Sequence, residues 1–270
     1  MTDSLSEFSE MNWAVPSFKL REFASRQTDY CVCIPVINEG ERLRRQLQEM
    51  KRLGLMAVAD TLILDGGSTD GSTADELLEA AGVRARLVKT GEGKLSAQLR
   101  MGYAYALRQG YKGVITVDGN GKDGVEAIPD FVRELRDGTD FIQGSRYVTG
   151  GRAINTPPLR ALAIKLIHAP LTSLAAGFRY TDTTNGFRGY SRRLLLSPAI
   201  QPFRSLFSTY ELIAYLPVRA ARAGFKVREI AVTRQYPASG KTPTKISHFS
   251  GNLLLLRILF QVLTGAFDPR

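Results

Sequence analysis

Cysteine and histidine are scarce, with 2 of each in 270 residues. Two cysteines cannot form a disulfide framework, and neither His168 nor His248 has a cysteine or a second histidine at the spacing of metal ligands. Cys31 and Cys33 alternate within an apolar segment, which places both on one side of an expected buried strand. We interpret them as reduced core residues, so a disulfide scaffold and a zinc site are not indicated.

Long apolar runs are also lacking. The longest, residues 253–263, falls well short of the roughly 20 residues that a membrane-spanning helix requires. Residues 1–28 contain Asp3, Glu7 and Glu10 and no extended apolar stretch, so the sequence does not predict a signal peptide. We therefore expect a cytoplasmic protein.

Acidic residues are outnumbered, because 36 Lys and Arg against 26 Asp and Glu give a formal net charge of +10. This excess favours an anionic partner, which can be nucleic acid, phospholipid headgroups or a phosphorylated small molecule. The basic residues are dispersed and do not form a stripe interleaved with aromatic residues, so nucleic acid is the least favoured of the three.

From residue 30 onward, short apolar runs alternate with segments whose apolar residues recur at helical spacing. This alternation predicts the α/β class, with a Rossmann-like, mostly parallel sheet flanked by helices in a single domain. We expect strands at 30–36, 62–64, 87–88, 114–117, 141–142 and 227–233. The chain divides into an N-terminal extension (1–28), a nucleotide-binding half (29–145), an acceptor-binding half (146–250) and a C-terminal apolar helix (251–270).

Asp118 and Asn120 follow the strand expected at 114–117. Their spacing puts two oxygen-bearing side chains on one side of an extended segment, an arrangement that suits Mg²⁺ or Mn²⁺. An Asx turn is the alternative interpretation. The glycines of residues 119–124 also match the dinucleotide fingerprint G-x-G-x-x-G, but that fingerprint belongs to the first strand-to-helix turn, and Asp118 would repel a pyrophosphate there.

Polar residues also follow the first two expected strands. Asn38 and Glu39 end the first strand, and Asp65 begins a segment rich in glycine and serine after the second. Each could be only a helix cap or a turn. Because open α/β sheets bind ligands at the carboxyl ends of their strands, the three strand ends together predict one ligand site.

At these residues the sequence resembles the family 2 glycosyltransferases, in particular the branch of the dolichyl- and polyprenyl-phosphate sugar transferases, across residues 29–250. The resemblance implies the GT-A fold, a nucleotide-diphosphate sugar (UDP or GDP) as donor, Mg²⁺ or Mn²⁺ as cofactor, and inversion by direct displacement. Family members that build polymers carry a Gln-x-x-Arg-Trp box. The only tryptophan here is Trp13, so we expect a non-processive enzyme.

The resemblance also assigns the donor side of the site. It implies that the nucleotide is contacted by Pro35, Asn38, Glu39 and Asp65, and that the flanking helix contributes Lys94 and Arg100. Asp118 and Asn120 would be the metal-binding pair of the family's Asp-x-Asp. Asn120 keeps a carbonyl oxygen but lacks the charge of aspartate, which leaves a role for Asp123 open.

The acceptor side follows from later motifs. The resemblance implies that phosphate groups are contacted by Arg146, Arg234, Lys241 and Lys245, and it makes the candidate catalytic residues Asp118, Asp182, Arg188 and Glu211. An alcohol acceptor must lose a proton and needs a carboxylate base, whereas a phosphate monoester, with a second pKa of ~6, is already largely ionised. Asp182 could alternatively orient Arg188, and Glu211 could fix a neighbouring arginine. We favour a polyprenyl-phosphate acceptor.

Two apolar segments could place the enzyme at a membrane surface, where it would bind such an acceptor. Residues 159–174 carry Arg160 and Lys165 among leucines and isoleucines, which is typical of an amphipathic helix that lies on a membrane surface or against the core. Residues 253–263 could join it. A peripheral position on the inner face of a membrane is therefore one expectation, and the oligomeric state is not indicated.

Other classes remain as alternatives. The same donor chemistry could act on an alcohol of a soluble or cell-surface glycan. A sugar-1-phosphate nucleotidyltransferase should have a glycine-rich loop after the first strand, which residues 35–45 lack. A non-catalytic nucleotide-binding protein would be compatible with Asn120 in place of an acidic metal ligand.

Overall fold

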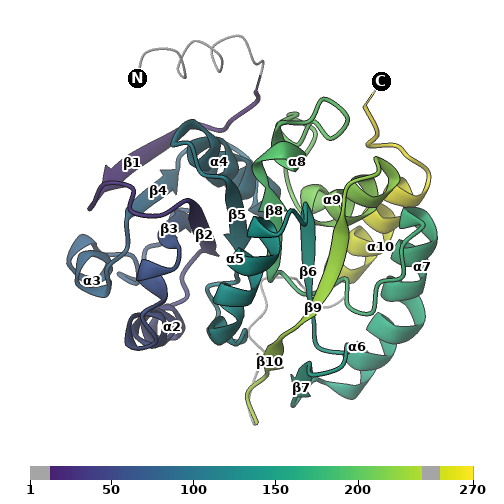
Figure 1. The fold of residues 1–270 in the computed structure, drawn as a ribbon, viewed down its shortest axis with the longest axis horizontal. Helices are drawn as coiled ribbons and strands as arrows, with labels where there is room; N and C mark the ends of the chain where they lie inside the picture. The colour runs from purple at the N-terminus through teal and green to yellow at the C-terminus, as the bar shows by residue number, and fades with distance from the viewer. Residues whose placement is uncertain (1–12, 239–249, 270) are drawn as a thin grey trace.

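The computed structural model describes residues 13–238 and 250–269. An eight-stranded sheet of order β1-β4-β3-β2-β5-β8-β6-β9 lies between helices on both faces (Figure 1). Its strands are β1 (Phe18–Glu22), β2 (Tyr30–Val36), β3 (Asp60–Asp65), β4 (Ala85–Lys89), β5 (Gly113–Thr116), β6 (Phe141–Ser145), β8 (Arg188–Ser191) and β9 (Val227–Ala231). A second, two-stranded parallel sheet joins β7 (Arg152–Ile154) to β10 (Thr233–Gln235).

The helices flank the sheet on both faces, with α2 and α3 near one end of it and α7, α9 and α10 near the other (Figure 1). They are α2 (Glu41–Arg52), α3 (Asp75–Ala81), α4 (Leu95–Arg108), α5 (Ile128–Arg136), α6 (Pro158–Ala163), α7 (Ala169–Ala176), α8 (Arg192–Leu196), α9 (Glu211–Arg222) and α10 (Ser250–Leu263). A π-helical turn, Ile164–His168, connects α6 to α7, so the amphipathic segment expected at 159–174 is helical throughout.

β2 shows how the sheet is buried on both faces. Cys31 and Cys33 face one hydrophobic core, together with residues of α4 and α9, while Val32 and Ile34 face the other, with residues of α2 and α5. This alternation is the period of two that an extended strand imposes. Both cysteines are free and buried, in agreement with the sequence analysis.

The parallel part of the sheet creates the edge that matters for function. β2 pairs in parallel with β3 and with β5, and β3 pairs in parallel with β4, so the expected α/β class with a mostly parallel sheet is confirmed. The carboxyl ends of β2, β3 and β5 therefore meet at one edge. Gly102 helps α4 to approach this region of the sheet, because a Cβ atom there would overlap the side chain of Leu64.

Two strands of the eight-stranded sheet were not predicted. β8 runs antiparallel to both β5 and β6, and its short sequence, Arg-Gly-Tyr-Ser, offers no apolar run for a pattern to detect. β1 pairs antiparallel with β4, so the sheet begins within the segment that was expected to be an extension. Trp13 also packs onto the domain, with its ring stacked on Phe203 at 4.0 Å between centroids.

Candidate active site

The loops after β2 and β3 are tied together by the polar residues that the sequence analysis selected. Asp65 is buried, and its Oδ1 atom accepts hydrogen bonds from the backbone N–H groups of Gly67 (2.9 Å) and Ser68 (2.7 Å). Asn38 has a φ of 50°, a left-handed conformation that asparagine tolerates better than most residues. Its Oδ1 atom accepts a hydrogen bond from the backbone N–H of Thr69 at 2.8 Å. These contacts preorganise the rim at which a nucleotide is expected.

The neighbouring residues of the expected nucleotide site lie on the same rim. Pro35 lies in β2, half-buried, and the buried Glu39 pairs with Arg42 at 2.9 Å. Lys94 is the exposed N-cap residue of α4, and its backbone N–H donates to the carbonyl of Ser208 at 2.8 Å. Contact of these side chains with a nucleotide stays a prediction.

Asp118 lies two residues after the end of β5, with 29% of its side chain exposed. Its Oδ2 atom accepts hydrogen bonds from Nη2 of Arg234 at 2.9 Å and from Nδ2 of Asn120 at 3.4 Å. Burial raises the pKa of Asp118, but the charges of Arg234 and Lys122 outweigh burial and hold that pKa below its usual value. The carboxylate is therefore ionised at neutral pH.

The residues around Asp118 fit a hard divalent cation. Oδ1 of Asp118 faces Gly186, where a Cβ atom would lie 2.5 Å from it, so the missing side chain keeps this oxygen uncovered. The amide of Asn120 would turn to present its oxygen to the same ion. Within the described ranges there is no group of three His, Cys, Asp or Glu side chains that could enclose a metal. This suits Mg²⁺ or Mn²⁺, which commonly bind one or two protein oxygens together with the phosphates of a nucleotide.

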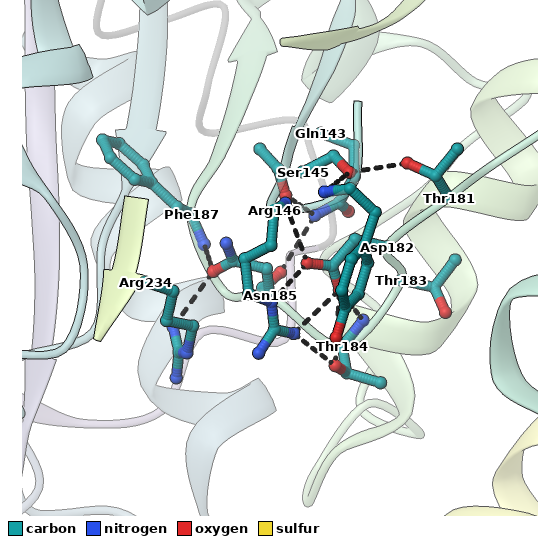
Figure 2. A network of polar contacts seen from close by, with 12 residues as sticks. Gln143, Ser145, Arg146, Thr181, Asp182, Thr183, Thr184, Asn185, Phe187 and Arg234 are labelled. Carbon is teal, nitrogen blue, oxygen red and sulfur yellow. Dashed lines mark hydrogen bonds and ion pairs between the residues drawn. The ribbon is translucent and has the colours of Figure 1, made fainter. Parts of the chain in front are cut away.

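The sequence left open whether Asp123 is a metal ligand, and in the structure Asp123 pairs with Arg234. Its side chain has no exposed surface, and both carboxylate oxygens accept hydrogen bonds from Nη1 of Arg234, at 2.6 and 2.7 Å. Asp123 therefore neutralises Arg234. Arg234 lies between Asp118 and Asp123 and also donates to Oδ1 of Asn185 at 3.0 Å (Figure 2). Its expected contact with an acceptor phosphate stays a prediction.

Arg146 and Asp182 form a fully buried ion pair, with no exposed surface on either side chain. Nε of Arg146 donates to Oδ2 of Asp182 at 2.6 Å, and Nη2 donates to Oδ1 at 2.9 Å (Figure 2). Nη2 also donates to Oγ1 of Thr184 at 3.0 Å. The remaining nitrogen of Arg146, Nη1, is buried and has no hydrogen-bond partner among the described residues, so one donor of this guanidinium is available to a ligand.

This pairing corrects one interpretation of the sequence. Asp182 does not orient Arg188, because Arg188 donates to the backbone carbonyls of Thr183 (2.9 Å) and Asn185 (3.1 Å) and to that of Ile213. Arg188 is buried in β8 and holds the loop after residue 182 against α9. A direct catalytic role for either Asp182 or Arg188 stays a prediction, and their contacts favour a positioning role.

Glu211, the third candidate carboxylate, begins α9. It accepts hydrogen bonds from the backbone N–H and from Oγ1 of Thr209, both at 2.6 Å. Arg100 on α4 donates to the carbonyl of Ala14, and burial lowers the pKa of Arg100 although Glu211 attracts its charge. The alternative that Glu211 fixes a neighbouring arginine is compatible with this geometry. Lys241 and Lys245 lie outside the described residues.

Two cationic side chains lie near the ring of Tyr147, on the side where the acceptor is expected. Nζ of Lys165 lies 5.0 Å from the centroid of the Tyr147 ring, and Cζ of Arg146 lies 5.5 Å from it. Both distances are in the range of cation–π attraction. Lys165 comes from the π-helical turn after α6, so this ring connects the buried Arg146 to the amphipathic helix.

The ring of Tyr236, two residues after Arg234, likewise has two cationic side chains near it. Nζ of Lys122 and Cζ of Arg160 lie 5.3 and 5.8 Å from the centroid of its ring. Burial raises the pKa of Tyr236, but the surrounding cations, Arg234 and Arg160 first, hold it below its usual value. The sequence analysis did not select Lys122 or Tyr236 for the site. Their only signal was position, since Lys122 is two residues after Asn120 and Tyr236 is two residues after Arg234.

The model of glycosyl transferase family 2 matches residues 31–196, more than half of the chain, and this range contains all of β2 except Tyr30, together with Asp118 and the Arg146–Asp182 pair. The chain belongs to glycosyl transferase family 2. Membership makes it a glycosyltransferase, and the edge formed by β2, β3 and β5 is accordingly its candidate active site.

Curated relatives agree with the assignment. The glycosyltransferase is 29% identical over 205 residues to polyprenol monophosphomannose synthase of Mycolicibacterium smegmatis, covering 75% of this chain and 76% of the relative. It is 28% identical over 203 residues to undecaprenyl-phosphate mannosyltransferase of Micrococcus luteus, covering 74% and 81%.

A solved structure shows the same fold. Glucosyl-3-phosphoglycerate synthase of Mycobacterium tuberculosis, in complex with Mn²⁺, UDP and phosphoglyceric acid, superposes with a TM-score of 0.61 at 15% identity, over 89% of this chain and 79% of that one. At this identity the likeness concerns the fold, and it confirms the expected GT-A architecture.

Proposed function

We propose that this glycosyltransferase moves one sugar from a nucleotide-diphosphate sugar to a polyprenyl phosphate, with inversion at the anomeric carbon and with Mg²⁺ or Mn²⁺ bound at Asp118. The donor would lie against the rim formed by Asn38 and Asp65. The two curated mannosyltransferases named above support a polyprenyl-phosphate acceptor, and the fold neighbour that holds Mn²⁺ and UDP supports the metal.

The surroundings of Asp182 are the observation that carries the choice of acceptor. An alcohol acceptor needs a free carboxylate base, but Asp182 is enclosed and bound through both oxygens by Arg146. An ionised phosphate needs no base and is attracted by cations. Such cations are supplied on this side by Arg160, by Lys165 and by Arg146, whose Nη1 has no partner in the part of the chain that the structure describes.

Each residue then has a defined task. Arg234 holds Asp118 in place through Oδ2 and leaves Oδ1 to the cation. A bound Mg²⁺ or Mn²⁺ would neutralise the charge that develops on the leaving diphosphate. Because the phosphate oxygen of the acceptor attacks the anomeric carbon directly, no enzyme nucleophile is required and the configuration inverts. Asp182 keeps the Arg146 guanidinium oriented toward the acceptor.

The acceptor class can be tested by a matched pair of lipids. We expect transfer of radiolabelled sugar from a GDP- or UDP-sugar to a short polyprenyl phosphate, and at least about 100-fold slower transfer to the corresponding polyprenol, because the alcohol lacks both the charge and the ionised oxygen. Comparable rates with the two lipids would contradict the phosphate acceptor and favour the alcohol alternative.

We further propose that the enzyme binds a membrane surface peripherally through the helical segment 158–176. By length and composition this is one helix among the described residues that could span a membrane, and 28% of it is buried in the protein. It exposes the large apolar side chains of Leu159, Leu162, Leu166 and Leu174, to 79%, 54%, 66% and 80%. The same helix carries Arg160 and Lys165, which suit anionic headgroups.

Vesicle binding tests this surface. Leu166→Asp should weaken binding to vesicles that contain anionic lipid about tenfold, as measured by sedimentation. The substitution replaces an exposed apolar side chain with a negative charge, which the anionic headgroups repel. Leu206→Asp, at a residue exposed to 42% outside this helix, should bind as the unmodified enzyme does. Equal binding of all three proteins would show that residues 158–176 do not contact the membrane.

A further inference from the structure

We propose that Glu229 is a positioning residue of the acceptor side, which fixes the guanidinium of Arg146 through the loop that contains Thr181 and Asp182. This inference rests on the proposed function, since it assigns one more residue to the site for the polyprenyl phosphate. Glu229 lies in β9, outside the motifs that the sequence analysis selected.

The carboxylate of Glu229 accepts hydrogen bonds from the loop after α7. The backbone N–H of Thr181 donates to both of its oxygens at 2.9 Å, and the backbone N–H of Asp182 donates to Oε1 at 3.1 Å. The hydroxyl of Thr181 donates to Oε2 at 2.9 Å. Donor groups of two consecutive residues therefore converge on one side chain, which ties the loop to β9.

Asp182 connects Glu229 to Arg146. Its backbone N–H is held by Glu229, and its carboxylate accepts from the backbone N–H of Arg146 at 3.3 Å as well as from Nε and Nη2 of the guanidinium. Neither side chain of this pair has exposed surface, and a buried ion pair requires good geometry to offset its loss of hydration. Because Glu229 fixes the backbone of Asp182, it also fixes the direction of the Arg146 guanidinium.

A chain of hydroxyl groups connects Glu229 to the backbone on the other side of Arg146. Oγ of Ser145 lies 2.6 Å from Oγ1 of Thr181 (Figure 2) and accepts from the backbone N–H of Tyr147 at 3.0 Å. An ionised carboxylate can only accept hydrogen bonds. The hydroxyl hydrogen of Thr181 therefore points to Glu229, and Ser145 must donate to Thr181. Glu229 thus sets the direction of the hydrogen bonds that hold the residues before and after Arg146.

The same contacts argue against Glu229 as a catalytic base for an alcohol acceptor. Both of its oxygens accept from Thr181, and one accepts from Asp182 as well, whereas a base must be within hydrogen-bond reach of the proton that it removes. Glu229 therefore acts through Arg146, whose Nη1 is buried without a partner among the described residues.

Steady-state transfer kinetics of Glu229→Gln test the inference. Glutamine keeps the size of the side chain but presents an NH₂ group to donors of Thr181 and Asp182. We expect KM for polyprenyl phosphate to rise about tenfold, while KM for the nucleotide sugar stays within about twofold of the unmodified enzyme. Equal increases in the two KM values, or no increase in either, would overturn the role of Glu229.

Glu134→Gln is the matched control. Glu134 lies on α5, is also buried, and accepts from Oγ1 of Thr139 at 3.1 Å and from Nη1 of Arg228 at 2.9 Å. Its replacement should lower stability about as much as Glu229→Gln does, because each variant disturbs hydrogen bonds of a glutamate that is largely shielded from water. It should leave both KM values unchanged, which distinguishes positioning from a general loss of stability.

A third set of variants shows whether Glu229 acts through Arg146. In an Arg146→Lys background, Glu229→Gln should change KM for polyprenyl phosphate less than about twofold, because the guanidinium that Glu229 positions is already missing. A full tenfold increase in that background would contradict the inference. Thr181→Val removes one bridging hydroxyl and should raise the same KM about threefold. An unchanged KM in Thr181→Val would count against the inference even if Glu229→Gln does not fold.

Hydrogen exchange at Nε of Arg146, followed by NMR on the isotope-labelled protein, needs no substrate and separates the inference from the proposed function. Exchange should be at least about tenfold faster in Glu229→Gln than in the unmodified enzyme, and unchanged in Glu134→Gln. If no sugar reaches polyprenyl phosphate, the proposed function fails, and faster exchange still supports the positioning of Arg146 by Glu229. If transfer occurs but exchange is equal in both proteins, only the role of Glu229 is overturned.

Discussion

Replacing Asp118 with alanine should lower the rate of sugar transfer on the order of 10³-fold, because the cation that we propose to neutralise the leaving diphosphate would lose the charged ligand assigned to it. The stability of the fold should change by less than about 1 kcal/mol, since Asp118 is partly exposed and Arg234 keeps its bidentate bond to Asp123. Initial rates and urea unfolding of the same preparation measure the two effects.

Asp130→Ala is the matched control for this experiment. Asp130 lies on α5, where its half-exposed side chain pairs with Arg133 at 2.7 Å, so its removal should leave both the rate and the stability nearly unchanged. A nearly unaffected rate in Asp118→Ala would remove the metal site from the mechanism.

Arg146→Met should have the largest effect on stability. It leaves the carboxylate of Asp182 with no exposed surface and without its charged partner, and breaking a buried pair in this way typically costs about 3–5 kcal/mol. We expect the urea midpoint to fall accordingly, with an unchanged dependence on urea concentration.

A double variant distinguishes the loss of the pair from the loss of packing. Arg146→Met combined with Asp182→Leu removes both charges, and most of the lost stability should return because no unpaired charge is left inside the protein. Transfer to polyprenyl phosphate should nevertheless stay low, since the guanidinium is missing. If Arg146→Met unfolds at the same urea concentration as the unmodified enzyme, then Asp182 does not depend on Arg146 in solution.

Periodicity and strand-end chemistry were enough to predict the parallel part of the fold. Cys31 and Cys33 face the same hydrophobic core because a strand alternates its side chains, and Asp65 and Asp118 lie at the same edge of the sheet because parallel strands end there. Both results depend on local patterns and a general rule of topology. Neither a local pattern nor this rule predicts the antiparallel strand β8, because β8 is stabilised by its pairing with the two strands on either side of it.

Charge partners were the part of the site that the sequence could not determine. Arg146 pairs with Asp182 across 36 residues, and Arg234 pairs with Asp118 and Asp123 across more than a hundred. No spacing rule connects residues so far apart, because the contact is created by the path of the chain. For this reason Asp182 was considered as a partner of Arg188, and the pairing of Arg234 with Asp118 and Asp123 was not predicted.

The proposed metal and diphosphate site at Asp118 is tested most directly by a crystal structure of the enzyme with Mn²⁺ and a nucleoside diphosphate. The manganese is located by its anomalous scattering. We expect one manganese ion bound to Oδ1 of Asp118 and to both phosphates, with the nucleoside lying along the loops after β2 and β3. A diphosphate bound away from the ends of β2, β3 and β5, or manganese that does not touch Asp118, would contradict it.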